Sequence, residues 1–277
     1  MAKLKRMFLQ RKATLIGLLL VVIIVVAAMS AGLLTRFAPD EMNVDNRLLG
    51  PSSVHLMGTD EFGRDLFSRV LYGARNSLIV AGCIVVVAVG LGLVFGLISG
   101  YYPKIDSVIM RIMDGLMAFP GIVLAIAMMG AMGPSMLNVI VALGIVYTPR
   151  VARVVRSFIL TIRESQYIEA AKSIGATDIR ILFRHILPNC ISPIVVQASF
   201  IFSYAILGEA ALSFLGVGVP ATLPSWGNIL SEGRVYMQIA PWLTVFPGLA
   251  IMLTVLGLNM MGDGLRDFLD PRLQRRK

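Results

Sequence analysis

Residues 169–188 read EAAKSIGATDIRILFRHILP, a charged segment that lies between two apolar stretches of the chain. Gly175 divides this segment, because glycine readily adopts the left-handed conformation that ends a helix. We expect one short helix over 165–174 and a second one after Thr177, whose hydroxyl can cap it. Pro188 is expected to end the second helix just before the next apolar stretch.

The second expected helix has one apolar face, and Arg180 and Arg184 share the opposite face. The apolar positions follow the spacing i, i+3, i+4 and i+7 of a single helix face, and they are Ile179, Leu182, Phe183 and Ile186. We therefore expect a compact unit of two short helices, apolar beneath and charged above. An ordinary amphipathic loop would show the same periodicity.

The composition of the chain is that of an integral membrane protein. Of its 277 residues, 57% are hydrophobic and 15% are charged, and the mean hydropathy is +0.80. Soluble domains are nearer roughly 45–50% apolar and about 25% charged. Cys83 and Cys190 fall in or beside different apolar segments and make neither a disulfide framework nor a CxxC site. We interpret them as packing thiols.

The charge-free stretches predict six transmembrane helices. Residues 13–35 carry no charge, a run longer than the apolar region of a secretory signal and long enough to cross the bilayer, so we expect an uncleaved first span. The turn signal GAMGPS at 130–135 divides the longest stretch into two helices. The expected spans are 13–35, 77–102, 115–132, 135–153, 191–210 and 241–262.

Residues 210–231 are apolar but are not expected to cross the membrane. Their helix breakers are Gly216, Gly218, Pro220, Pro224 and Gly227, a density that a helix in lipid cannot tolerate because freed backbone groups stay unpaired there. We expect an irregular loop held against the protein at the surface, with Trp226 at the membrane interface.

The distribution of Lys and Arg sets the expected orientation. With both termini in the cytoplasm, 19 basic residues lie on the cytoplasmic side and 6 on the outside. This asymmetry follows the positive-inside rule, and it explains the net charge of +9 without nucleic acid as a partner. The segment 169–188 is therefore expected in the cytoplasm.

The pattern of this segment resembles the EAA signature of ABC importer permeases. Glu169-Ala170-Ala171 is followed by three residues, Gly175, nine residues and a position two before Leu187-Pro188. His185 departs from the pattern, which has an aliphatic residue there. Other stretches are similar to the C-type permease of dipeptide, oligopeptide and nickel importers: GTDEFGRDLFSRVLYGARNSL (58–78), RIMDGLMAFP (111–120), FLGVGVPATLPSWGNIL (214–230) and GDGLRDFLDPR (262–272). The resemblance covers about residues 12 to 272.

The resemblance implies an all-α, polytopic fold, the type I transmembrane domain of an ABC importer. It divides the chain into an N-terminal helix with an external loop (1–75) and a permease core (76–277) with a cytoplasmic EAA loop (163–190). The implied place is the bacterial cytoplasmic (inner) membrane, and the implied cargo is a di- or oligopeptide. The implied partners are a B-type permease, two ABC ATPases and an extracytoplasmic solute-binding protein.

In this family the EAA segment is the coupling helix that docks on an ATPase. The residues that the resemblance assigns to this contact are Glu169, Ala170, Ala171, Gly175, Ile179, Leu187 and Pro188. The chain itself has no GxxxxGK[ST], and its nearest Lys-Ser pair, Lys172-Ser173, lacks the glycines. We therefore expect no enzyme activity and no cofactor in this chain, with ATP and Mg²⁺ used by the partner ATPases.

Four small residues recur every four positions in the second expected span, namely Ala88, Gly92, Gly96 and Gly100. Such a stripe lets helix backbones approach closely, and the neighbour could belong to this chain or to the partner permease. In the external loop, an amphipathic helix at the surface is expected from Phe67, Val70, Leu71 and Ala74. It would feed the second span or contact the binding protein.

The ionisable residues near the apolar stretches fall at expected span ends, which gives no proton or ion path. They are Arg111, Asp114, Arg150, Glu209, Glu232 and Asp263. Glu209 is the candidate for a gate or a substrate contact, with structural pairing as the alternative. No metal site is expected, because His55 and His185 lie on opposite sides of the membrane and methionines usually fill apolar gaps.

Three other functions stay open at this stage. The same architecture could import nickel or a nickel chelate, since nickel permeases share these motifs. An ion-driven secondary transporter would need acidic residues in the middle of its spans and internal repeats, and neither is found. A channel or scaffold without energy coupling would have no use for the EAA segment.

Overall fold

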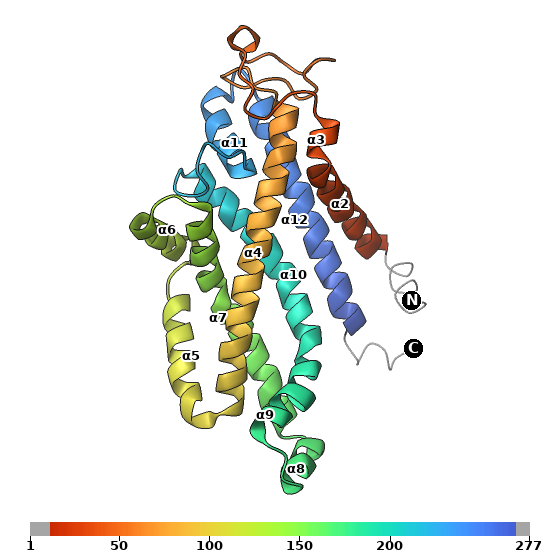
Figure 1. Ribbon diagram of the computed structural model, residues 1–277, viewed down its shortest axis with the longest axis vertical. Helices are drawn as coiled ribbons and strands as arrows, with labels where there is room; N and C mark the ends of the chain where they lie inside the picture. Colours follow the sequence, from red (N-terminus) through yellow and green to blue (C-terminus); the bar gives the residue numbers. More distant parts are fainter. Residues whose placement is uncertain (1–11, 270–277) are drawn as a thin grey trace.

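The computed structural model describes residues 12–269, and within that range every regular element is helical (Figure 1). The basic residues before Lys12 and the tail after Leu269, which contribute to the expected orientation, lie outside the described residues. The long helices are α2 (Lys12–Met29), α4 (Leu66–Tyr101), α7 (Met136–Arg163), α10 (Leu187–Phe214) and α12 (Trp242–Leu269). The shorter elements are α3 (Ala31–Leu34), η1 (Val44–Asn46), α5 (Pro103–Met117), α6 (Gly121–Met132), α8 (Gln166–Ser173), α9 (Asp178–Ile181), η2 (Leu182–Ile186), α11 (Trp226–Gly233) and η3 (Arg234–Tyr236).

Five helices are long and apolar enough to cross a membrane, and the pair α5 and α6 makes a sixth span if it is counted as one. The expected straight span at 115–132 is wrong, because α5 ends at Met117 and α6 leaves it at an angle of 89°. Pro120, just before α6, has no N–H to continue the α5 ladder. The break expected at 130–135 is present between α6 and α7.

Helix α7 is longer than the expected span 135–153, since it continues to Arg163. Because of this extension, one charged residue lies farther from the end of its helix than expected. Arg150, expected at the end of a span, lies halfway along α7 and is exposed.

Helices α4 and α7 form the stem of the molecule, and they pack side by side in the same direction over most of the length of α7 (Figure 1). A Cβ atom on Gly96 would lie 2.6 Å from the Cβ of Val155, and one on Gly100 would lie 2.8 Å from the Cβ of Ile159. Gly92 meets Val151 in the same way, and Ala88 is fully buried. The neighbour of the small-residue stripe is therefore a helix of this chain.

The first span packs against the last one. Gly17 of α2 faces Met260 and the backbone of Gly257, and Gly264 of α12 faces Thr14. The start of α2 and the end of α12 thus lie together, toward the end of the bundle that carries α8 (Figure 1). The charge distribution of the sequence predicts that this end lies in the cytoplasm, and we refer to it as the cytoplasmic end.

The external loop differs from expectation in two places. Val70, Leu71 and Ala74 are buried within the first turns of α4, so no separate surface helix forms and residue 75 is no boundary between elements. Trp226 is not at the lipid interface: its side chain is buried, and its Nε1–H donates to the carbonyl of Val70 at 3.1 Å. A large ring with one donor gains more from this enclosed partner than from the interface.

We predict that Gly92→Ala lowers the stability of the protein, because its Cβ would meet the side chain of Val151 and the carbonyl oxygen of Thr148. Overpacking of this kind costs about 1–3 kcal/mol. A Cβ added at Gly90 on the same helix would have nothing within 4 Å, so Gly90→Ala should match or exceed the parent, since alanine is the better helix former. Thermal unfolding in detergent checks this, and equal midpoints for both variants would contradict it.

Candidate functional site

The segment made of α8, α9 and η2 projects beyond the bundle at its cytoplasmic end (Figure 1). As expected, a short helix ends just before Gly175, which has φ of +79°. The backbone N–H of Gly175 bonds to the carbonyl of Lys172, and that of Ala176 bonds to Ala171, so the end of α8 is closed by a tight turn. We call residues 165–188 the coupling segment.

The coupling segment is anchored to the stem by an apolar cluster. Ile168, Ala171 and Ile181 are buried against Val155 and Ile159 of α7. Since α7 is itself packed along α4, the segment rests on both helices of the stem. Displacing it would require these buried side chains to separate or the stem to move with it.

Polar contacts tie the same segment to the cytoplasmic end of α4. The hydroxyl of Tyr101 donates to the Asp178 carboxylate at 2.6 Å, and the ammonium of Lys172 lies 5.8 Å from the centre of the Tyr101 ring. Arg163, at the end of α7, donates to the carbonyl oxygen of Gly100 at 3.2 Å. The segment is therefore held to α4 through both α8, by Lys172, and α9, by Asp178.

The apolar face expected after Thr177 is wrong in its register. Ile179 and Phe183 point to solvent, whereas Ile181 and Ile186 are fully buried. The reason is that 182–186 form a π-helical turn, in which the N–H of residue 187 bonds to the carbonyl of residue 182. A π turn adds one residue to the repeat, so buried positions are spaced by five there.

Pro188 does not end the helix, contrary to expectation, and residues 178–214 run on as one candidate span. Pro188 lacks the N–H that an α-helix would direct to the carbonyl of residue 184. The π turn just before it already uses a wider bonding pattern, and the proline falls in the first turn of α10, where a missing N–H is tolerated.

The outer surface of the coupling segment combines small, charged and apolar side chains. Glu169 and Ala170 are exposed on α8, whereas Ala171 faces the core. Three large apolar side chains stand out to solvent beside them, with exposed fractions of 85%, 70% and 62%: Ile174, Ile179 and Phe183. Leu187 is half-buried and Pro188 is exposed. Of the residues assigned by resemblance, most therefore reach a common outer surface.

Glu209, the candidate gate, is fully buried and cannot touch a substrate in this conformation. The hydroxyls of Ser77 and Ser213 donate to its two carboxylate oxygens at 2.9 and 2.8 Å. Ser77 also accepts the backbone N–H of Trp226. Glu209 therefore links α4, α10 and the start of α11, which is the structural pairing that the sequence left as the alternative.

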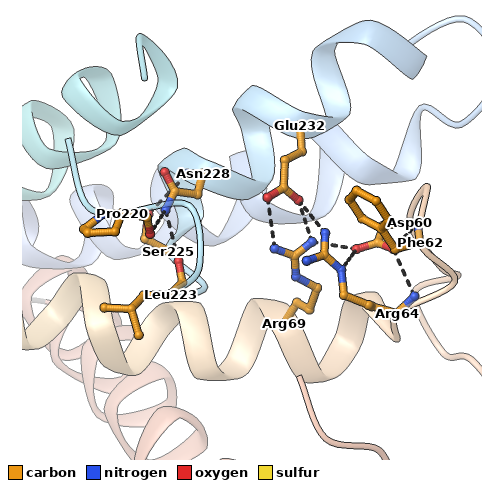
Figure 2. A network of polar contacts seen from close by, with 9 residues as sticks. All are labelled: Asp60, Phe62, Arg64, Arg69, Pro220, Leu223, Ser225, Asn228 and Glu232. Atoms are coloured by element: carbon orange, nitrogen blue, oxygen red, sulfur yellow. Dashed lines mark hydrogen bonds and ion pairs between the residues drawn. The ribbon is translucent and has the colours of Figure 1, made fainter. Parts of the chain in front are cut away.

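Figure 2 shows a charge network at the opposite end of the stem. The guanidinium of Arg69 on α4 bridges Asp60 at 2.6 Å and Glu232 on α11 at 2.5 Å. Arg64 pairs with the same two carboxylates at 2.6 and 2.9 Å. Asn228, one turn before Glu232, donates to three carbonyl groups of the Gly/Pro-rich loop, those of Val219, Pro220 and Leu223. The network holds α11 and its loop on α4.

Two of the three acidic residues gathered at this network are already paired with cations. Carboxylate oxygens of Asp60, Glu61 and Glu232 lie within 4.8 Å of one another, but the two guanidinium groups already neutralise Asp60 and Glu232. Partial burial raises the pKa of Glu61, which further disfavours its anionic, ligating form.

The pairing of Arg69 with Glu232 had no signal in the sequence, because the two residues are 163 positions apart. Asp60, Arg64 and Asp65 could be expected to pair or cap locally from their close spacing. Arg64 bonds to Asp60, and Asp65 caps α4 by accepting the N–H of Ser68.

We predict that Arg69→Ala loosens the external end of the protein. Asp60 would keep only one of its two buried cations, and removal of one partner of a buried ion pair costs about 3 kcal/mol. Arg75 on the same helix is exposed and forms no ion pair with the residues that the structure describes, so Arg75→Ala should leave stability unchanged. Thermal unfolding and the rate of proteolysis in the loop 36–65 measure the difference, and matching curves for both variants would refute it.

Comparison with known proteins adds a second line of evidence. Residues 92–275 match the family described as "Binding-protein-dependent transport system inner membrane component", and residues 3–51 match the "N-terminal TM domain of oligopeptide transport permease C". In fold, the chain is similar to an inward-facing methionine ABC transporter, with a TM-score of 0.61, 19% identity, and coverage of 73% of this chain and 96% of the other.

Three relatives illustrate the sequence similarity. A putative peptide transport system permease protein of Brucella suis is 48% identical over 97% of this chain and 91% of its own length. The dipeptide transport system permease protein DppC of Alkalihalophilus pseudofirmus is 49% identical over 96% of this chain and 88% of its own. The glutathione transport system permease protein GsiD of Escherichia coli is 45% identical, also over 96% and 88%.

Proposed function

This chain belongs to the family of binding-protein-dependent transport system inner membrane components, and from that premise we propose that it is the permease subunit of a bacterial ABC importer that moves small peptides across the cytoplasmic membrane. The observation that carries the proposal is the coupling segment. It is fixed to both helices of the stem and presents Glu169, Ala170 and an apolar rim to the outside.

The outer surface of the coupling segment suits a docking contact with an ATPase subunit. Exposed apolar groups of this size, gathered on one projection, are typical of a surface that another protein covers. Ala170 leaves room for close approach, and Glu169 offers a charge to a basic or amide partner. Ile174, Ile179 and Phe183 would then be the side chains that enter the partner.

The stem turns this contact into movement at the membrane. Ile168 and Ala171 pack on α7. Helix α7 in turn packs on α4 at glycines where an added Cβ atom would clash with its neighbours. A displacement of the coupling segment would therefore move the stem as a unit, whereas a flexible loop would absorb it. This is the physical basis for alternating access driven by nucleotide closure of the ATPases.

The remaining parts of the machine would be supplied by other chains. We infer a second permease subunit, two ATPase subunits that bind ATP and Mg²⁺, and an extracytoplasmic binding protein that delivers cargo. This chain has no phosphate-binding loop, so the energy has to reach it by contact. The match of 3–51 to the oligopeptide permease C domain supports the C-type position beside a B-type permease.

Peptide is favoured over nickel as the cargo. The relatives described above are named for peptide, dipeptide and glutathione transport. Ion-driven transport has little support, because Glu209 is held by serine hydroxyls and Asp106 and Asp114 are paired with arginines.

We predict that Glu169→Lys uncouples transport from ATP hydrolysis. The purified importer should assemble normally, yet its uptake of peptide should fall by about tenfold or more, since a charge reversal at a docking contact costs more than about 1.4 kcal/mol. Glu164→Lys makes the same charge change on an exposed residue just outside α8 and should stay near the parent. Unchanged uptake and unchanged cargo-stimulated ATP hydrolysis in Glu169→Lys would count against the docking role.

The cargo is tested by deleting this chain in its native host and measuring uptake of a labelled dipeptide and of labelled nickel. We expect peptide uptake to be lost and nickel uptake to be kept, with recovery when the chain is restored. Loss of nickel uptake alone would reverse the assignment.

A further inference from the structure

Arg150 lies halfway along α7. It is 14 residues from the start of a 28-residue helix, which places it roughly 21 Å along its length. Its neighbour Val151 meets Gly92, and Gly92 lies in the middle of the charge-free part of α4. If the hydrocarbon core of about 30 Å begins where α7 begins, Arg150 lies roughly 9 Å inside its cytoplasmic boundary.

Two tyrosines hold the guanidinium in place. The Cζ of Arg150 lies 4.7 Å from the centre of the Tyr204 ring on α10 and 5.9 Å from that of Tyr147 on α7. The hydroxyl of Tyr147 donates to the backbone carbonyl of Tyr204 at 3.0 Å, which fixes the Tyr147 side chain against α10. Stacking on rings covers the face of a guanidinium and leaves its N–H edge free.

The arginines next to Arg150 on the helix are satisfied in a different way. Arg153 pairs with Asp114 of α5 at 2.6 Å, and Arg156 pairs with Asp106 of α5 at 2.5 Å. Within residues 12–269, no carboxylate lies within ion-pairing distance of Arg150, and no described group accepts a hydrogen bond from it. The deepest of the three charges is therefore the one without an anion.

The face of α7 that carries Arg150 is exposed and lies away from α4. Val151 and Val155 on the other side pack on α4, so Arg150 points away from the stem, between α5 and α10. Ser157 and Thr161 follow at i+7 and i+11 on the same face, and both are exposed. A charged residue at bilayer depth faces either water or another protein chain, and this polar stripe runs from the middle of α7 toward the cytoplasm.

We propose that Arg150, seated on Tyr147 and Tyr204, is a cargo-contact site that receives the terminal carboxylate of the peptide in a water-filled passage. The proposal rests on the proposed function and adds a residue and a chemical group to it. A peptide with a free C-terminus offers a planar carboxylate, and the open edge of a guanidinium binds this group through two parallel hydrogen bonds.

An arginine without a carboxylate partner among the described residues can bind cargo reversibly, whereas an arginine in a permanent ion pair cannot. An internal carboxylate, such as those facing Arg153 and Arg156, would occupy the edge of Arg150 and compete with cargo. Aromatic support keeps the guanidinium oriented without using its N–H groups. The cation can then bind a passing carboxylate and release it again.

The first experiment measures peptide uptake by the complete importer in proteoliposomes, with a binding protein loaded with a tripeptide. Arg150→Gln should lower uptake by about tenfold or more, the worth of a charge-assisted hydrogen-bonded pair. Arg153→Gln, the same change at an exposed ion pair three residues away, should stay within about twofold of the parent. Arg150→Lys keeps the charge and should fall between the parent and Arg150→Gln.

Several outcomes would overturn the site. If uptake by Arg150→Gln equals that of the parent, the cargo contact is refuted and the proposed function stands. If the parent imports no peptide, both the proposed function and the cargo contact are refuted. An equal loss in Arg150→Lys and Arg150→Gln would contradict recognition of an anion. Loss of the second permease from purified Arg150→Gln would identify Arg150 as an interface ion pair instead.

A second measurement does not depend on transport. Arg150→Cys is placed in a Cys83→Ser background, because Cys83 is exposed, whereas Cys190 is buried and stays. A charged, membrane-impermeant methanethiosulfonate should modify the new thiol in the assembled importer, and excess tripeptide should slow the reaction several-fold. A thiol that does not react, or that reacts equally fast with and without peptide, refutes the wet, cargo-contacting site.

Discussion

The close packing of α4 on α7 is the contact on which the rest of the structure depends. Gly92, Gly96 and Gly100 let the two backbones approach until side chains of α7 occupy the space where Cβ atoms would be. In lipid, where the hydrophobic effect does not drive helices together, such van der Waals contact is the main source of association. It makes two helices, each roughly 40–55 Å long at about 1.5 Å per residue, behave as one rod.

Both ends of this rod carry a rigid attachment. At the cytoplasmic end, Ile168 and Ile181 are buried against α7, and Tyr101 of α4 bonds to Asp178. At the external end, Arg69 of α4 is bound to Asp60 and Glu232, which brings α11 onto the rod. The two attachments are therefore joined through one continuous helix, α4, which is the path that the proposed coupling to an ATPase uses.

The arginines in the second half of α7 are held by two different kinds of contact. Arg153 and Arg156 pair with carboxylates of α5, and the less exposed pair, Arg156 with Asp106, is the stronger link between α5 and the stem. Arg150 stacks on two aromatic rings, and no carboxylate among residues 12–269 forms an ion pair with it. Because Arg150 differs from the other two in this respect, it is the arginine of α7 that we propose as the cargo contact.

The sequence by itself determined the membrane class, the division of the chain near 133, the left-handed turn at Gly175 and the family, because each depends on local composition or on a fixed spacing of residues. The tertiary structure alone decided the register of 178–188, the burial of Trp226 and Glu209, the bend after Met117, and the partners of Arg69 and Arg150. A π turn shifts a helix face by one residue, and a buried polar group takes whichever partner the fold brings to it, often more than 100 positions away. Hydropathy measures the cost of placing a residue in lipid, but it contains no information about which residues meet there.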